Sequence, residues 1–187
     1  MTRVLIFGIN GYIGGLSADA LSRAGYIVDG VGTVPFVDPK LGFVDKYFQI
    51  QEYLTDLTFK IEEYDEVIFC ISLDHNKTEH NYRKSIDVNC GILSELLQIC
   101  LQSHRKPRII YLSTMQVYSQ QNCFSGQIDI TNMYAFTHYA CEKLLSLYPN
   151  PMILRLANVY GPPVTERANI DWTLIASVCK GLAETGI

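Results

Sequence analysis

Apolar runs and amphipathic segments alternate along most of the chain. Short runs rich in Val, Ile, Leu and Phe, typical of buried strands, occupy residues 4–7, 26–31, 66–71, 108–113 and 152–156, and a short strand is expected within 43–50. Between and after them, apolar residues recur at helical spacing over residues 16–24, 82–103, 133–147 and 171–183. Strands that alternate with helices need crossover connections. The pattern therefore predicts an α/β fold: a doubly wound parallel sheet with helices on both faces, formed by one domain over residues 1–187.

A glycine-rich turn lies between the first strand and the first helix. Its spacing, Gly8-x-x-Gly11-x-x-Gly14, is a variant of the dinucleotide-binding fingerprint. Glycine allows the sharp turn and leaves the amides at the helix N-terminus bare for a phosphate. The candidate cofactor-binding residues of this turn are Gly8, Asn10, Gly11, Tyr12, Ile13 and Gly14. The sequence therefore predicts a Rossmann-like domain that holds a dinucleotide at this turn.

Composition and charge restrict the partners. The chain has 15 Lys and Arg against 19 Asp and Glu, a net charge of −4, and no basic run, which argues against nucleic acid or an anionic membrane. No apolar stretch is long enough to span a bilayer, and the N-terminus lacks a signal-peptide pattern. The six cysteines show no C-x-x-C spacing, so we interpret them as reduced core residues of a cytoplasmic protein and expect no metal site.

Three later segments resemble a known family. Residues 112–118 (LSTMQVY) are similar to the S-[ST]-x-x-V-Y segment of extended short-chain dehydrogenases/reductases, the NAD-dependent nucleotide-sugar epimerases and dehydratases. Residues 154–162 (LRLANVYGP) resemble the L-R-x-x-N-V-Y-G-P run of the same group. Val88-Asn89, followed by the helix that carries Leu96-Leu97, is similar to its N-V-x-G-T-x-x-L-L segment. Together with the glycine turn, four motifs lie in the family's order across residues 4–162.

The resemblance implies an enzyme that binds NAD or NADP and reversibly oxidises a ring hydroxyl of a nucleotide sugar. In the family a Ser or Thr, a Tyr and a Lys carry the chemistry, and Thr114 matches the first, which bonds the substrate oxygen. The phenol exchanges the proton, and the lysine charge favours the phenolate and holds the nicotinamide ribose. The matches to cofactor-contacting positions are Thr33, Ile71, Ser72, Asn89 and Ala157, and the match to a substrate-binding position is Asn158. For the asparagine in the long helix, a purely structural role bonded to backbone stays open.

Two tyrosines of one predicted helix compete for the catalytic place. Tyr139 and Lys143 satisfy Y-x-x-x-K literally, whereas Tyr134 is followed by His138 where the lysine belongs. The family motif commonly continues as Y-x-x-[ST]-K-x-x-x-E, and only the count from Tyr134 puts a threonine and a glutamate at those places. We therefore interpret Tyr134 as the family tyrosine and His138 as the replacement of the lysine, with Tyr139 and Lys143 as the alternative pair.

The sequence departs from the family at two positions. Histidine has an ordinary pKa of ~6.5 and is mostly neutral at pH 7, so His138 is a weak substitute for a lysine charge. Gly32 stands where NAD-preferring members carry an acidic residue, and no arginine follows Thr33, so the choice between NAD and NADP stays open. Lys40 is the nearest cation, and Asp29, earlier on the second strand, is expected to be a partly exposed edge group.

The resemblance also bears on domain organisation and partners. Family members continue past the N-V-Y-G-P segment into a lobe that holds the sugar nucleotide, and residues 163–187 are expected to be the start of such a lobe, most of which is missing. A homodimer is expected through the helices at 82–103 and 133–147, because family members often dimerise through two such helices per subunit. The alternative to an active enzyme is a catalytically impaired dinucleotide-binding module that acts as a redox sensor or partner subunit.

Overall fold

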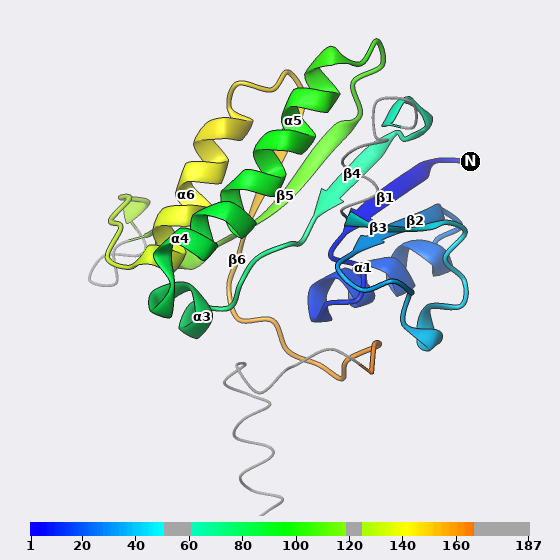
Figure 1. Ribbon diagram of the computed structural model, residues 1–187, viewed down its shortest axis with the longest axis horizontal. Coiled ribbons are helices and arrows are strands. Elements are labelled where there is room, and N and C mark those ends of the chain that lie inside the picture. Colours follow the sequence, from blue (N-terminus) through cyan, green and yellow to red (C-terminus); the bar gives the residue numbers. More distant parts are fainter. Residues whose placement is uncertain (51–60, 119–124, 167–187) are drawn as a thin grey trace, which may run out of the picture.

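Six parallel strands form a sheet in the order β3-β2-β1-β4-β5-β6 (Figure 1). The computed structural model describes residues 1–50, 61–118 and 125–166. The strands are β1 (Arg3–Phe7), β2 (Ile27–Gly32), β3 (Tyr47–Gln49), β4 (Glu66–Phe69), β5 (Arg108–Thr114) and β6 (Pro151–Leu156). Each strand predicted from the apolar runs is confirmed, and the order is that of doubly wound dinucleotide-binding sheets.

Helices cover both faces of the sheet (Figure 1). α1 (Tyr12–Arg23) lies on one face, and α4 (Tyr82–Ser85), α5 (Ile92–Gln102) and α6 (Met133–Leu145) lie on the other. The helix predicted over 82–103 is interrupted by a π-helical stretch, η4 (Ile86–Gly91), and a short helix that was not predicted, α3 (His75–His80), precedes it. Three 3-10 turns complete the described elements: η1 (Pro39–Leu41), η3 (Ile61–Glu63) and η5 (Met115–Val117). The helix predicted at 171–183 lies outside the described residues.

Alternation along the strands divides the core into two layers. In β1, Val4 and Ile6 face α1, whereas Leu5 and Phe7 face α5 and α6, and all four are fully buried. Burial on both faces explains why the central strands appear as unbroken apolar runs in the sequence.

Asp29 is completely buried, so the expectation of a partly exposed edge group was wrong. β2 is not an edge strand, because β3 pairs with it on the side away from β1. The Asp29 carboxylate accepts hydrogen bonds from Arg3 Nε at 2.8 Å, from Tyr64 Oη at 2.8 Å and from the Lys46 amide at 2.9 Å. These bonds compensate for its burial and tie β1 to β2 and to the segment before β3.

Four of the six cysteines lie in the described part of the chain, and all four are free thiols: Cys70, Cys90, Cys100 and Cys141. Within the same ranges, no three or more His, Cys, Asp and Glu side chains gather as a metal site would require. Nor is any helix of the described ranges both long enough and apolar enough to pass through a bilayer.

Candidate active site

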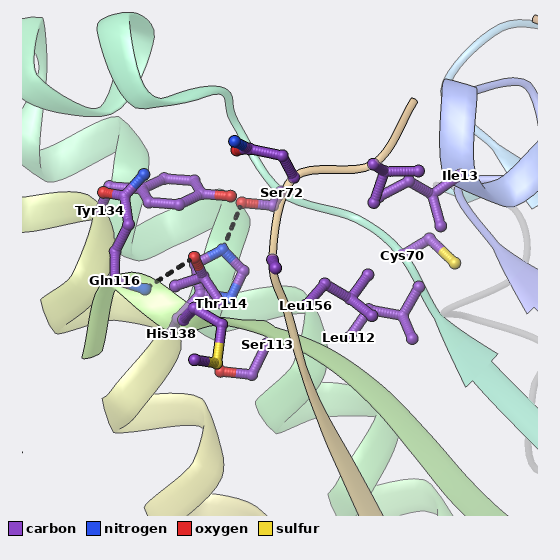
Figure 2. A pocket seen from close by; sticks show the side chains of 14 residues that line it. Ile13, Cys70, Ser72, Leu112, Ser113, Thr114, Gln116, Tyr134, His138 and Leu156 are labelled. Carbon is purple, nitrogen blue, oxygen red and sulfur yellow. Dashed lines mark hydrogen bonds between the residues drawn. The ribbon is translucent and has the colours of Figure 1, made fainter. Parts of the chain in front are cut away.

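A cavity of about 330 Å³ opens where the carboxyl ends of the central strands meet. Figure 2 shows Tyr134, His138, Ser72 and Thr114 on one side of it, and Ile13 and Cys70 on the other. The other lining residues are Leu112, Ser113, Met115, Gln116, Leu156, Ala157, Asn158 and Val159. Residues from four separate motifs of the sequence are thus brought together, including Thr114, Tyr134 and His138.

The glycine turn after β1 fits a pyrophosphate. Gly8 has a φ of +83°, and its amide donates to Val31 O at 2.8 Å. A Cβ added to Gly14 would lie 2.2 Å from Gly8 O, so the close approach of α1 to the turn needs glycine there. α1 begins after Gly11, which offers no side chain to cap the first amides. Those amides, together with the positive end of the helix dipole, suit a phosphate group.

Two predicted cofactor residues of this turn use their side chains to hold neighbouring segments. Asn10 Oδ1 accepts from the Asp38 amide at 2.8 Å, and Asn10 Nδ2 donates to Phe36 O at 3.2 Å. Tyr12 is buried, and its hydroxyl donates to Gly161 O at 3.0 Å. A contact of Asn10 or Tyr12 with a dinucleotide therefore rests on the backbone amides.

A phenol occupies the space beside Gly32 at the end of β2. A Cβ on Gly32 would lie 2.3 Å from Tyr47 Oη, and this hydroxyl donates to Val34 O at 2.6 Å. Thr33 is exposed just beyond the strand. Lys40, the cation expected nearest to this end, lies 3.7 Å from the Glu166 carboxylate. The position of Tyr47 beside Gly32 was missed from the sequence. A tyrosine in a strand of three residues gives no indication of which way its side chain points.

Thr114 and Tyr134 reach the cavity from β5 and α6. Thr114 ends β5, and its Oγ1 accepts from the Gln116 amide at 3.2 Å (Figure 2). Tyr134 lies in the first turn of α6, which Asn132 caps by accepting from the Ala135 amide at 2.7 Å. Burial raises the pKa of the Tyr134 phenol above its ordinary value, and the nearby Asp74 charge adds to the effect. The phenol is therefore protonated at neutral pH.

His138 is buried between a strand and the loop after β4. Its Nε2 lies 3.2 Å from Ser72 Oγ, as drawn in Figure 2. On the other side of the ring, its Nδ1 lies 2.8 Å from Tyr111 Oη. The Tyr134 ring packs edge-on against the imidazole, with 4.6 Å between the centroids. Burial lowers the pKa of His138 to about 4, although the Glu142 charge acts in the opposite direction. The imidazole is therefore neutral and brings no positive charge to the Tyr134 phenol.

The alternative pair lies away from the cavity. Lys143 Nζ is placed 4.9 Å from the centroid of the Tyr139 ring, and Lys143 is exposed. Neither residue lines the cavity, and the two contact each other instead. The geometry thus agrees with the interpretation of Tyr134 as the family tyrosine.

The Asn89 side chain is hydrogen-bonded to protein groups beside the cavity. It is buried, its Oδ1 accepts from the Leu73 amide at 2.8 Å, and its Nδ2 donates to Thr137 Oγ1 at 3.0 Å. These bonds agree with the structural role that the sequence left open for Asn89, and its contact with a cofactor stays a prediction. The bond to Leu73 fixes the loop after β4, where Ile71 faces the glycine turn and the exposed Ser72 lines the cavity.

A partly buried ion pair joins α6 to β6. Arg155 Nη2 lies 2.6 Å from Glu142 Oε2, and Ser113 Oγ donates to Glu142 Oε1 at 2.6 Å. Burial alone would raise the pKa of Glu142, but the hydrogen bonds from Arg155 and Ser113 outweigh it and hold the pKa below its ordinary value. Ala157 and Asn158 line the cavity just beyond this anchored strand.

Comparison with known proteins agrees with this geometry. The sequence matches the NAD dependent epimerase/dehydratase family over residues 4–185. No curated protein sequence matches the chain.

Three solved structures share the fold. TunA, an NAD dependent NDP-hexosamine 5,6-dehydratase involved in tunicamycin biosynthesis, matches 98% of the chain with 23% identity and a TM-score of 0.81. The UDP-glucose 4-epimerase of Thermotoga maritima matches 87% with 19% identity and a TM-score of 0.71. The enzyme WbmH of Bordetella bronchiseptica, solved with NAD+, matches 87% with 22% identity and a TM-score of 0.69. The matches span 62%, 57% and 57% of those structures' own lengths.

At these identities the solved structures establish the fold, a Rossmann-like parallel sheet, and the family match establishes the kinship. The matched range contains the glycine turn and all three residues expected at the reacting centre. The chain belongs to the NAD dependent epimerase/dehydratase family.

Proposed function

We propose that the chain is the dinucleotide-binding domain of an NAD(P)-dependent epimerase or dehydratase that acts on a nucleotide sugar. The observation that carries this proposal is the convergence of the glycine turn, Thr114 and Tyr134 at one end of the sheet. The substrate class follows from the relatives, since one is an NDP-hexosamine dehydratase and another a UDP-glucose epimerase.

Each residue then has a separate task. The bare amides at the start of α1 hold the pyrophosphate, and NAD or NADP supplies the hydride acceptor and donor when bound. Thr114 Oγ1 hydrogen-bonds the substrate oxygen, and the Tyr134 phenol exchanges a proton with that oxygen. Ala157 would contact the nicotinamide and Asn158 would contact the substrate, since both line the cavity. Because no carboxylate extends from Gly32 or Thr33, both NAD and NADP remain candidates.

Turnover of UDP- or dTDP-sugars tests the assignment of the tyrosine. Tyr134→Phe should abolish turnover, because it removes the proton that the substrate oxygen exchanges. Tyr139→Phe is the matched control on the same helix and should retain turnover. The reverse result would transfer the role to Tyr139 and Lys143.

A second function, dinucleotide binding without turnover as a redox sensor or partner subunit, is favoured by His138. A neutral imidazole engaged by Tyr111 and Ser72 does not supply the lysine charge that activates the phenol in the family. A fluorescence titration with NADH and NADPH should saturate under either function. Turnover separates them, and an increase in turnover in His138→Lys would support the loss of a lysine as the cause of impairment.

We further propose a cytoplasmic homodimer. The free thiols and the charge balance support the location, and an apolar surface on the helices supports the assembly. Exposed large hydrophobic residues occur along these helices and beside them, and we call this set the α5/α6 face: Tyr82 on α4, Ile86 on η4, Leu101 on α5, Phe136 on α6 and Leu147 just after α6. A groove between α5 and α6, lined in part by Leu97, Leu101 and Leu144, adjoins it.

A further inference from the structure

Three side chains from different elements form one hydrogen-bonded chain that ends in the candidate active site. Tyr111 lies in β5 and is buried, His138 lies in α6 and is buried, and Ser72 lies after β4 and is exposed toward the cavity. The imidazole joins the other two, at 2.8 Å to Tyr111 Oη and 3.2 Å to Ser72 Oγ.

The donor and acceptor in each of these hydrogen bonds follow from the single proton that each hydroxyl carries. Ser72 Oγ donates to Leu73 O at 2.9 Å, so it can only accept from the imidazole. Nε2 of His138 must then carry the proton, and Nδ1 of the neutral ring accepts from the Tyr111 hydroxyl. Leu73 is itself held by Asn89, which keeps the acceptor for the Ser72 proton in place.

We infer that Tyr111 and His138 are positioning residues that orient Ser72 so that its hydroxyl accepts a hydrogen bond from a ligand hydroxyl in the cavity. Ser72 Oγ has two lone pairs, and His138 uses one of them. The other is available to a donor from the exposed side. A lysine ammonium at position 138 could only donate hydrogen bonds to a ligand. With histidine there, this side of the cavity instead presents the Ser72 hydroxyl as an acceptor.

The inference rests on the proposed function and specifies it further, since both a dinucleotide and a nucleotide sugar carry hydroxyls. A ribose or a sugar hydroxyl can donate to Ser72, whereas a phosphate oxygen or a carbonyl cannot. The hydrogen bonds from Tyr111 through His138 to Ser72 thus select a ligand group that donates a proton. Separate titrations with NADH and UDP-glucose show whether that group belongs to the dinucleotide or to the nucleotide sugar.

The first test needs no ligand. Nitrogen-15 NMR of histidine-labelled protein, with the His138 signals identified by their loss in His138→Gln, should show the neutral Nε2–H tautomer at pH 7. Tyr111→Phe should release Nδ1 and produce a mixture of tautomers. The titratable groups that face the ring are Tyr111 from β5 and Tyr134 and Glu142 from α6. An Nδ1–H tautomer or an imidazolium at pH 7 would overturn the inference.

The second test measures binding. Ser72→Ala should weaken one of the two ligands roughly threefold to tenfold, as expected for one hydrogen bond, and the weakened ligand is the source of the hydroxyl. Ser146→Ala, an exposed serine at the end of α6, is the matched control and should bind like the wild type. If the wild type binds the ligands and Ser72→Ala binds both equally well, the inference is overturned. The proposed function is not affected by that result. If the wild type binds neither ligand, the proposed function fails and the inferred ligand contact fails with it, even where the tautomer is the expected one.

Discussion

Proton placement at Tyr134 and His138 decides what the candidate site can do at the scale of single residues. The phenol keeps its proton, because burial raises its pKa and the adjacent imidazole is neutral. In the family that the sequence resembles, a lysine is expected beside this phenol, where its charge favours the ionised form. The site is therefore better suited to donate a proton from Tyr134 than to remove one at neutral pH.

The buried imidazole makes stability depend on pH. The pKa of His138 is lowered to about 4 in the folded protein, against ~6.5 when unfolded, so the unfolded state binds more protons between these values. This contribution is complete above pH ~6.5 and is lost as the pH falls toward 4. We expect the folded protein to lose about 2 kcal/mol of its free energy of unfolding from this group between pH 7 and pH 5.

Denaturant unfolding at the two pH values measures the loss. The wild type should lose about 2 kcal/mol more than His138→Gln, whose amide does not titrate. Titrating groups that do not interact with His138 are present in both proteins and cancel in the comparison. Equal losses in the two proteins would show that His138 is not held neutral.

At the scale of elements, contacts far apart in the sequence determine where α6 lies. Glu142 on α6 and Arg155 on β6 form an ion pair in which the Glu142 side chain is only 6% exposed. Arg155 also lies over the Tyr118 ring, with 4.6 Å from its guanidinium carbon to the centroid. Tyr134 and His138 lie on the same helix as Glu142. The Glu142–Arg155 ion pair therefore helps to set how far these two residues lie from Thr114.

Glu142→Ala should therefore destabilise the protein by about 1–3 kcal/mol, because it leaves the partly buried Arg155 guanidinium and the buried Ser113 hydroxyl without their acceptor. Arg23→Ala, which breaks the exposed Asp19–Arg23 pair of α1, is the control and should change the free energy of unfolding by less than about 0.5 kcal/mol. Thermal or denaturant unfolding gives both values. Equal effects of the two substitutions would show that the Glu142–Arg155 pair does not anchor α6.

The strands and the glycine turn could be predicted from sequence, because each depends on local signals. Apolar runs identify strands that are buried on both faces, and only glycine meets the backbone demands at Gly8 and Gly14. The position of Tyr134 at the cavity was predictable by register against the family motif. The burial of the Asp29 carboxylate was not predicted. It depends on the pairing of β2 with β3, and β3 is a short strand with a weak sequence pattern.

The hydrogen-bonded chain through His138 was not predictable for a similar reason. Tyr111, Ser72 and His138 are separated by 27 to 66 residues, and nothing in the local pattern relates them. A tyrosine in an otherwise apolar strand is a signal that its hydroxyl needs a partner, but the partner is identified only when α6 packs on β5. The π-helical stretch over Ile86–Gly91 is likewise invisible to a pattern of period 3.6.

At the scale of the whole molecule, the α5/α6 face is the surface that a second copy would cover. Leu147, just after α6, has 77% of its surface exposed and lines the groove between α5 and α6 together with Leu97, Leu101 and Leu144. The family resemblance places dimer contacts on these two helices, and the proposed homodimer uses the same face.

Leu147→Asp should convert the dimer to a monomer, because it introduces a charge into the apolar contact. Tyr26→Asp, at the exposed turn between α1 and β2, is the control and should leave the assembly unchanged. Sedimentation velocity measures the mass of each variant. A wild-type monomer, or a dimer that survives Leu147→Asp, would contradict the proposed interface.

Dinucleotide binding at the turn between β1 and α1 underlies every proposed role in this molecule, and calorimetric titration with NADH measures it. The wild type should show saturable binding at one site. Gly14→Ala, whose Cβ would lie 2.2 Å from Gly8 O, should bind at least tenfold more weakly. Gly42→Ala should bind like the wild type, since its φ is −61° and its nearest atom lies 3.7 Å away. A thermal melt verifies that all three proteins are folded. Absence of saturable binding to the folded wild type, or equal affinity of Gly14→Ala, would contradict the account.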